Sequence, residues 1–164
     1  MGLDQFSAYL LLGSNLGDRK QLLLSALALI EEKAGAIFAQ SGFYETEAWG
    51  KTDQPDFVNM AVGIKTDLPA LNLLRVLLDI ERELGRVRVE KWGERLIDID
   101  LILYGAEIID LGDELQVPHP QMQNRKFVLA PLAEIAPKVV HPILKKTISE
   151  ILAILTDSLS VSKI

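Results

Sequence analysis

Two aspartates at strand spacing are the residues of this sequence best suited to chemistry. Asp98 and Asp100 lie in residues 97–104, a segment whose alternating pattern predicts a β-strand. One face would carry Ile97, Ile99, Leu101 and Leu103, and the other Asp98, Asp100, Ile102 and Tyr104. On one face of a strand the two Cα atoms are about 6.7 Å apart. The carboxylates can therefore share a hard divalent cation or a close pair of cations, whereas without a cation they would repel each other.

Four cations precede this strand. Arg86, Arg88, Lys91 and Arg95 follow or flank Gly85 and Gly93, and the two glycines indicate a loop rather than a helix. Guanidinium groups bind phosphate oxygens with two hydrogen bonds, and carboxylates hold Mg²⁺ against the same oxygens. This combination is what phosphoryl transfer needs. The alternative from these residues alone is the solvent face of an edge strand, with the arginines as solubilising charges.

A longer series of residues resembles a known family. It consists of Arg86-x-Arg88, Trp92-Gly93-x-Arg95-x-x-Asp98-x-Asp100, Val117-Pro118-His119-Pro120 and Asn124-Arg125-x-Phe127. The series is similar to that of the 6-hydroxymethyl-7,8-dihydropterin pyrophosphokinases of folate biosynthesis, and the resemblance extends over residues 9–154. It implies attack of the pterin hydroxymethyl oxygen on the β-phosphorus of ATP, with release of AMP.

The resemblance also implies the residues of the site. The catalytic residues would be Arg86, Arg95, Asp98 and Asp100. The pterin would be bound by Thr46, Trp49, Phe57, Asn59 and Phe127, with Phe57 and Phe127 on either side of the ring. ATP would be bound by Glu81, Arg88, Lys91, Trp92, His119 and Arg125. Mg²⁺, as two ions with ATP, would bind Asp98 and Asp100.

For three of these positions, the residue type and its place in the sequence also suit a purely structural role. Asn59 lies with Phe57 on one face of a predicted strand, where an amide can bond the edge of a flat heterocycle, but it can equally be a satisfied polar group. Glu81 falls in the last turns of a predicted helix, where a glutamate is usually surface charge. His119 stands between two prolines that restrict its direction, which also suits a structural histidine.

Composition limits the function further. The chain has 164 residues, 49% of them hydrophobic, which favours a single domain over residues 1–164 with a substantial core. With 23 acidic and 17 basic residues the net charge is -6, so nonspecific binding to nucleic acid is not expected. Without cysteine and with two histidines, any metal is expected to be bound by oxygen. No signal peptide or membrane span is evident, and we expect a cytoplasmic monomer without membrane partners.

The predicted elements indicate an α+β fold. Strands are expected over residues 8–12, 37–44, 57–64 and 97–104, and a short hairpin is expected to begin at 107–109. Helices are expected from an N-cap at Asp18 to Gly35, and over 68–84, 127–135 and 147–155, the last covering the sheet. Residues 158–164 are expected to be frayed. This order predicts a ferredoxin-like sandwich with helices packed on a mainly antiparallel sheet, in agreement with the family.

Two other functions fit parts of the pattern. An Mg²⁺-dependent nucleotidyltransferase also suits an Asp-x-Asp pair on such a sheet, and it would release pyrophosphate instead of AMP. A noncatalytic sensing domain would bind a heterocycle or a nucleotide without turning it over. Such a domain would have no reason to collect Arg86, Arg88, Arg95 and Arg125 around a carboxylate pair.

Overall fold

The computed structural model describes residues 5–15, 17–46, 56–86, 97–156 and 160–164, with the backbone alone for Arg86. The strands are β1 (Phe6–Ser14), β2 (Ala36–Gln40), β3 (Tyr44–Thr46), β4 (Phe57–Thr66), β5 (Asp98–Tyr104), β6 (Ile109–Asp110), β7 (Gln116–Val117) and β8 (Val161–Lys163). The helices are α1 (Arg19–Lys33), α2 (Ala70–Arg86), the 3₁₀ turn Met122–Asn124, α3 (Lys126–Ile135) and α4 (Ile148–Ile154). None of the described helices is long and apolar enough to cross a membrane.

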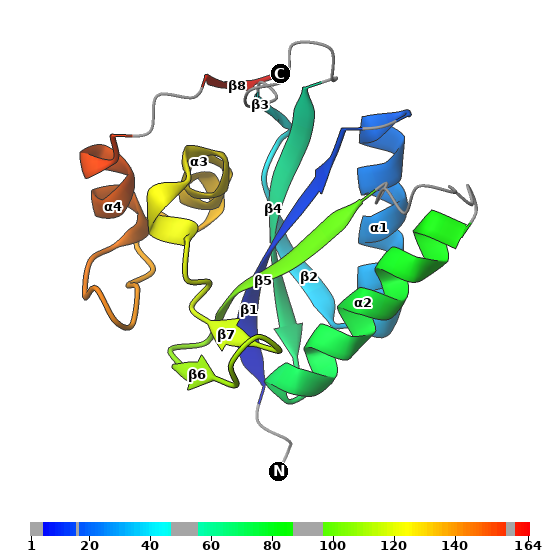
Figure 1. Cartoon of the computed structure of the whole chain (residues 1–164), viewed down its shortest axis with the longest axis horizontal. Helices are drawn as coiled ribbons and strands as arrows, with labels where there is room; N and C mark the ends of the chain where they lie inside the picture. Colours follow the sequence, from blue (N-terminus) through cyan, green and yellow to red (C-terminus); the bar gives the residue numbers. More distant parts are fainter. Residues whose placement is uncertain (1–4, 16, 47–55, 87–96, 157–159) are drawn as a thin grey trace.

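One antiparallel sheet organises these elements. Its strands follow the order β5-β1-β4-β3-β8, and β2 also pairs with β4. Helices α1 and α2 lie on one face of the sheet, whereas α3 and α4 lie on the other (Figure 1). The short strands β6 and β7 form a separate hairpin. The expected α+β, ferredoxin-like class is confirmed, because helices pack on both faces of one antiparallel sheet.

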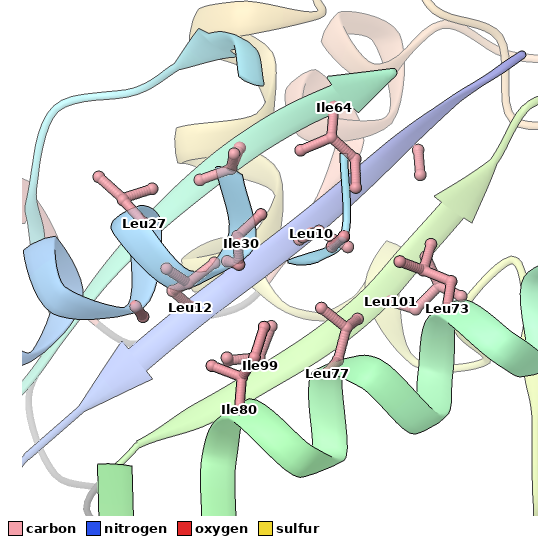
Figure 2. Packing of buried hydrophobic residues seen from close by; sticks show 14 of the residues in the cluster. Leu10, Leu12, Leu27, Ile30, Ile64, Leu73, Leu77, Ile80, Ile99 and Leu101 are labelled. Carbon is pink, nitrogen blue, oxygen red and sulfur yellow. The ribbon is translucent and has the colours of Figure 1, made fainter. Parts of the chain in front are cut away.

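The larger core lies between the sheet and α1 and α2 (Figure 2). Helix α2 contributes Leu73, Leu77 and Ile80, spaced four and three residues apart so that they form one stripe. They face Ile99 and Leu101 of β5, as Figure 2 shows. Helix α1 begins as predicted, since the Asp18 side chain accepts a hydrogen bond of 3.2 Å from the Gln21 amide.

A second core lies between the other face of the sheet and α3. It joins Tyr9 and Leu11 of β1 to Leu129 and Leu132 of α3, all buried. Helix α4 packs mainly on α3, and its Ile148 and Ile151 belong to the same buried cluster as Tyr9 and Leu11 of the sheet. Its start is fixed by a capping box, in which Thr147 and Glu150 exchange side-chain and backbone hydrogen bonds of 3.1 and 2.8 Å.

Two segments of β-structure differ from the sequence expectations. The strand expected over residues 37–44 is two strands, because Ser41 interrupts it: its amide donates to the Ala61 carbonyl, and its hydroxyl accepts from the Ala61 amide, both at 2.9 Å. The prediction that the C-terminal tail is frayed is wrong for residues 160–164, which the structure describes. Strand β8 pairs with β3, and the Ile164 amide donates to the Phe43 carbonyl at 2.9 Å.

The alternation expected along β5 breaks at a β-bulge. Leu10 of β1 faces Leu101, but the preceding residue Tyr9 faces Leu103, so Ile102 is an extra residue on β5. Leu103 consequently joins the second core and Tyr104 the first, opposite to the prediction. The Tyr104 ring stacks on Phe6 with centroids 4.7 Å apart. The bulge lies beyond Asp98 and Asp100, so their expected common face is preserved.

Candidate active site

The register of the sheet brings distant polar residues into one row. Tyr44 of β3 faces Asn59 of β4, Asn59 faces Gly13 of β1, and Gly13 faces Asp98 of β5. Directly opposed residues of antiparallel strands point to the same face. Asp100 is opposite Leu11, which belongs to the core under α3. The aspartate pair and Asn59 therefore share the face of the sheet that α3 covers.

Asn59 is buried, and within the described residues its side chain makes two long hydrogen bonds. Its side chain is 4% exposed. The Thr46 hydroxyl donates to its Oδ1 at 3.4 Å, and its Nδ2 donates to the Leu12 carbonyl at 3.4 Å. Both distances are at the long end of the hydrogen-bond range. The amide can thus exchange these bonds for shorter ones to a ligand that offers both a donor and an acceptor.

Gly13 provides the room for this amide. A Cβ atom at position 13 would lie 2.4 Å from Asn59 Nδ2, closer than real contacts allow. The glycine between Asn59 and Asp98 is therefore required by close approach of a side chain, and its role follows from the pairing of β1 with β4. Sequence reasoning did not single out Gly13, because nothing local indicates which residue lies opposite it.

Glu81 connects α2 to the strand of the aspartate pair. Its Oε2 accepts a hydrogen bond of 2.6 Å from the Ile99 amide, between Asp98 and Asp100. Asp98 is partly exposed and Asp100 is exposed. Within the described part of the chain no three His, Cys, Asp or Glu side chains are grouped to hold a metal ion. Two carboxylates nevertheless fit Mg²⁺, which commonly takes one or two protein carboxylates and fills its shell with water and substrate phosphates.

A cavity of about 390 Å³ opens beside these residues, between α2, β5 and the β6–β7 hairpin. Among its walls are three predicted site residues, Glu81, Asp100 and His119. The other lining residues are Leu74, Leu78, Ile99, Leu101, Gly112, Asp113, Glu114, Leu115, Gln116 and Pro120. Sequence reasoning missed this second group, because the short hairpin that supplies half of it has little pattern of its own. The volume is within the range of small-molecule sites.

His119 is oriented by its backbone neighbours. Its amide donates to the Ile102 carbonyl at 2.9 Å, and its Nδ1 accepts from the Gln121 amide at 3.2 Å. Burial lowers the pKa of His119, and the charge of Arg125 lowers that pKa further. A neutral imidazole whose Nδ1 accepts must carry its proton on Nε2. His119 can therefore offer one N–H donor to an anionic group in the cavity.

The aromatic candidates come from different elements. Phe57 begins β4 opposite Thr46, two residues from Asn59 on the same face. Phe127 lies in the first turn of α3 and packs against the second core. The Arg125 guanidinium is 5.8 Å from the centre of the Phe127 ring, within cation–π range.

The remaining predicted residues cannot be located in this arrangement. Trp49, Arg88, Lys91, Trp92 and Arg95 lie outside the described residues. The backbone of Arg86 ends α2. The structure thus brings Glu81, Asp100 and His119 to one cavity, and places Thr46, Phe57 and Asn59 on neighbouring strands.

Known proteins similar to this chain fall in one family. Residues 9–137 match the family described as 7,8-dihydro-6-hydroxymethylpterin-pyrophosphokinase (HPPK). The 2-amino-4-hydroxy-6-hydroxymethyldihydropteridine pyrophosphokinase of Bacillus subtilis is 48% identical over 133 residues, which are 80% of this chain and 79% of the relative. The enzyme of the same name from Methylorubrum extorquens is 47% identical over 153 residues, 92% of this chain and 94% of the relative.

A solved structure shares the fold at low sequence identity. The Plasmodium falciparum HPPK-DHPS aligns with a TM-score of 0.69 and 18% identity. The alignment covers 93% of this chain but 45% of that longer chain, so this chain spans less than half of it. The matching residues and the close relatives together show that this chain belongs to the 7,8-dihydro-6-hydroxymethylpterin-pyrophosphokinase family.

Proposed function

We propose that the cavity beside β5 and the row around Asn59 are the two halves of a pyrophosphokinase site, with Asp98 and Asp100 between them. As a member of this family, the chain transfers pyrophosphate from ATP to the hydroxymethyl group of 6-hydroxymethyl-7,8-dihydropterin, in folate biosynthesis. The pterin oxygen bonds to the β-phosphorus of ATP as the bond to the α,β-bridging oxygen breaks. AMP leaves, and the hydroxyl proton is released. The observation that carries the assignment is the common face of Asn59, Asp98 and Asp100.

The cavity is the proposed ATP site. The Nε2–H of His119 and the guanidinium of Arg125 would bond phosphate oxygens, and Glu81 would hold the wall formed by α2 and β5. The apolar residues at the α2 side, Leu74 and Leu78, suit the flat face of adenine. Arg88, Lys91 and Trp92 are also proposed to bind ATP, on the basis of the family motif alone.

The pterin is proposed to bind at the row itself. Asn59 would exchange its two bonds of 3.4 Å for bonds to the ring edge, with Thr46 as its neighbour. Phe57 and Phe127 would lie on either side of the ring, and Trp49 would line the pocket. Burial of Asn59 supports this reading, since a buried amide that is weakly bonded gains most from a matching ligand.

Magnesium is proposed to bind Asp98 and Asp100. Pyrophosphokinases of this family use Mg²⁺ with ATP, and we propose two ions. When bound, Mg²⁺ would neutralise charge that develops on the phosphate oxygens. Arg86 and Arg95 are proposed to stabilise the same charge and to align the attacking oxygen, which is the main requirement of a loose phosphoryl-transfer transition state.

The nucleotide product tests the proposal. We expect that ATP, Mg²⁺ and 6-hydroxymethyl-7,8-dihydropterin incubated with the protein yield AMP and a pterin diphosphate in equal amounts, measured by chromatography. Omission of the pterin should abolish AMP formation. ADP would mean single-phosphoryl transfer, released pyrophosphate would mean nucleotidyl transfer, and binding of both ligands without product would mean a sensing domain. Each of these results would contradict the proposal.

Gly13→Ala is expected to weaken pterin binding without unfolding the protein. The added Cβ must displace Asn59 Nδ2, which it would otherwise approach to 2.4 Å. We expect the Kd of the pterin to rise by about tenfold, as for a misplaced polar contact. Gly85→Ala is the matched control for pterin binding, because no atom of the described residues would lie within 4 Å of a Cβ there. Equal pterin affinities in the two variants, measured by calorimetry, would contradict the role of Gly13.

We also propose that residues 1–164 form one pyrophosphokinase domain that acts as a monomer. Strands from both ends of the sequence, β1 and β8, belong to one sheet, which supports a single domain. Light scattering coupled to gel filtration, compared with activity per chain at several concentrations, would test the oligomeric state.

A further inference from the structure

Glu134, near the end of α3, collects donors from three separate segments. Its Oε1 accepts from the Tyr44 hydroxyl at 2.7 Å and lies 3.2 Å from Lys163 Nζ. The Gly42 amide donates to both carboxylate oxygens at 3.3 Å. One side chain of α3 therefore joins the turn before β3, the strand β3 itself and the C-terminal strand β8.

The C-terminal strand extends the row of the candidate site. Lys163 of β8 faces Tyr44, which faces Asn59, so the row runs from Lys163 through Tyr44, Asn59 and Gly13 to Asp98. The side chain of Lys163 passes over Gly42, where a Cβ would lie 2.7 Å from Lys163 Cε. Both β8 and α4 lie outside the part of the chain, residues 9–137, that matches the family.

The protonation states of Tyr44 and Glu134 favour a stable hydrogen bond between them. Burial raises the pKa of Tyr44, and the hydrogen bond to Glu134 with its negative charge raises it further, to about 12. Burial alone would raise the pKa of Glu134, but hydrogen bonds from Tyr44, Lys163 and Gly42 outweigh it and lower that pKa. At neutral pH the phenol is therefore a donor and the carboxylate an acceptor, so the contact does not titrate during an ordinary assay.

Helix α3 carries both Glu134 and Phe127, and so links the contacts of Glu134 to the proposed pterin site. Phe127 and Glu134 are seven residues apart, which places them on the same side of the helix after two turns. The side chains of Leu129 and Leu132 hold the helix on the sheet by apolar packing, which has no preferred direction along the sheet. Hydrogen bonds to a carboxylate are directional. Glu134 can thus fix how far α3, and with it Phe127, lies along the row.

We propose that Glu134, held by Tyr44 and Lys163, is a positioning residue that sets the placement of Phe127 relative to Asn59 and Thr46. The inference rests on the proposed pterin site. Its consequence is that the C-terminal strand contributes to pterin recognition without contacting the pterin. The distance between Phe127 and the row of strand residues would then depend on β8, which lies outside the residues that match the family.

Kinetics of Glu134 variants test this role. We expect Glu134→Ala to raise the KM of the pterin by about tenfold, with kcat and the KM of ATP changed by less than about twofold. Glu134→Gln should recover most of the loss, because its amide oxygen still accepts from Tyr44 and Gly42. Lys33→Met is the matched control: it breaks the Lys33–Glu83 ion pair of 3.2 Å between α1 and α2 and should change neither KM.

Three results would separate the possible failures. A lower Tm of Glu134→Ala with an unchanged pterin KM would make Glu134 merely structural and overturn the inference. Asn59→Ala, measured in parallel, reports on the site itself: if it leaves pterin binding unchanged, the proposed site is wrong. If Asn59→Ala weakens binding and Glu134→Ala does not, the inference alone fails.

Milder variants keep the inference testable if Glu134→Ala does not fold. Tyr44→Phe and Lys163→Met each remove one donor to Glu134. Each is expected to raise the pterin KM by about two- to threefold, and the two effects should be less than additive in the double variant, since both act through the Glu134 carboxylate. Unchanged pterin KM values in both single variants would contradict the positioning role.

Discussion

Asp98→Asn and Asp100→Asn are each expected to lower kcat by about a thousandfold or more, because each removes one of the two carboxylates proposed to hold Mg²⁺ against the phosphates of ATP. Asparagine keeps the shape of the side chain but lacks the negative charge. Asp98 is partly exposed and Asp100 is exposed, so the fold should tolerate the change. Steady-state AMP production at saturating ATP, Mg²⁺ and pterin measures the effect, and thermal unfolding checks the fold.

A matched control separates loss of the metal site from loss of charge in general. Asp79→Asn removes a carboxylate of α2 whose partner is the exposed Arg82, at 2.6 Å. This variant should retain wild-type kcat. Raising the Mg²⁺ concentration should restore part of the activity of the Asp98 and Asp100 variants if they bind the ion more weakly. Near-normal turnover in either aspartate variant at ordinary Mg²⁺ would contradict the metal assignment.

Asn59→Ala is expected to weaken pterin binding by about a hundredfold while ATP affinity stays within about twofold. The ring edge would lose a donor and an acceptor in a buried position, where unpaired polar groups cost most. The residue is not among those lining the 390 Å³ cavity, so the ATP site should be unaffected. Isothermal titration with each ligand in turn measures the two affinities.

The control for this variant is Asn72→Ala. Asn72 is exposed on α2, away from the row, and its replacement should leave both affinities unchanged. A Tm measurement on each variant reports whether the fold is retained. If Asn59→Ala lowered ATP affinity and spared the pterin, the two halves of the site would have been assigned the wrong way round.

Local pattern was enough to predict several parts of this protein. The strand period of two predicted that Asp98 and Asp100 share one face. The alternation of residues 57–64 predicted that Asn59 and Ala61 lie on one face of the strand and Val58 and Met60 on the other. The apolar residues agree, since Ala61 belongs to one core and Val58 and Met60 to the other. The N-cap at Asp18 followed from its side chain and its place before an apolar pattern. These features depend only on chain geometry within a few residues.

Errors arose where pairing between strands overrides local pattern. The bulge at Ile102 reverses the sides of Leu103 and Tyr104, because β1 has one residue fewer than β5 at that point. The break at Ser41 depends on bonds to Ala61, twenty positions away in sequence. Residues 161–163 form a strand because β3 offers an unpaired edge, which no pattern within the tail reveals.

The sequence by itself therefore determined the chemistry of this protein: a carboxylate pair on one strand face, arginines beside it, an amide between apolar neighbours and a motif shared with the pyrophosphokinases. The tertiary structure alone decided which residues from distant parts of the chain lie next to one another. The register through Gly13 brings Asn59 toward Asp98, the β6–β7 hairpin closes the cavity on His119, and Glu134 joins α3 to β8. The physical reason is that side-chain direction follows from local backbone geometry, whereas register and closure depend on contacts between residues far apart in the chain.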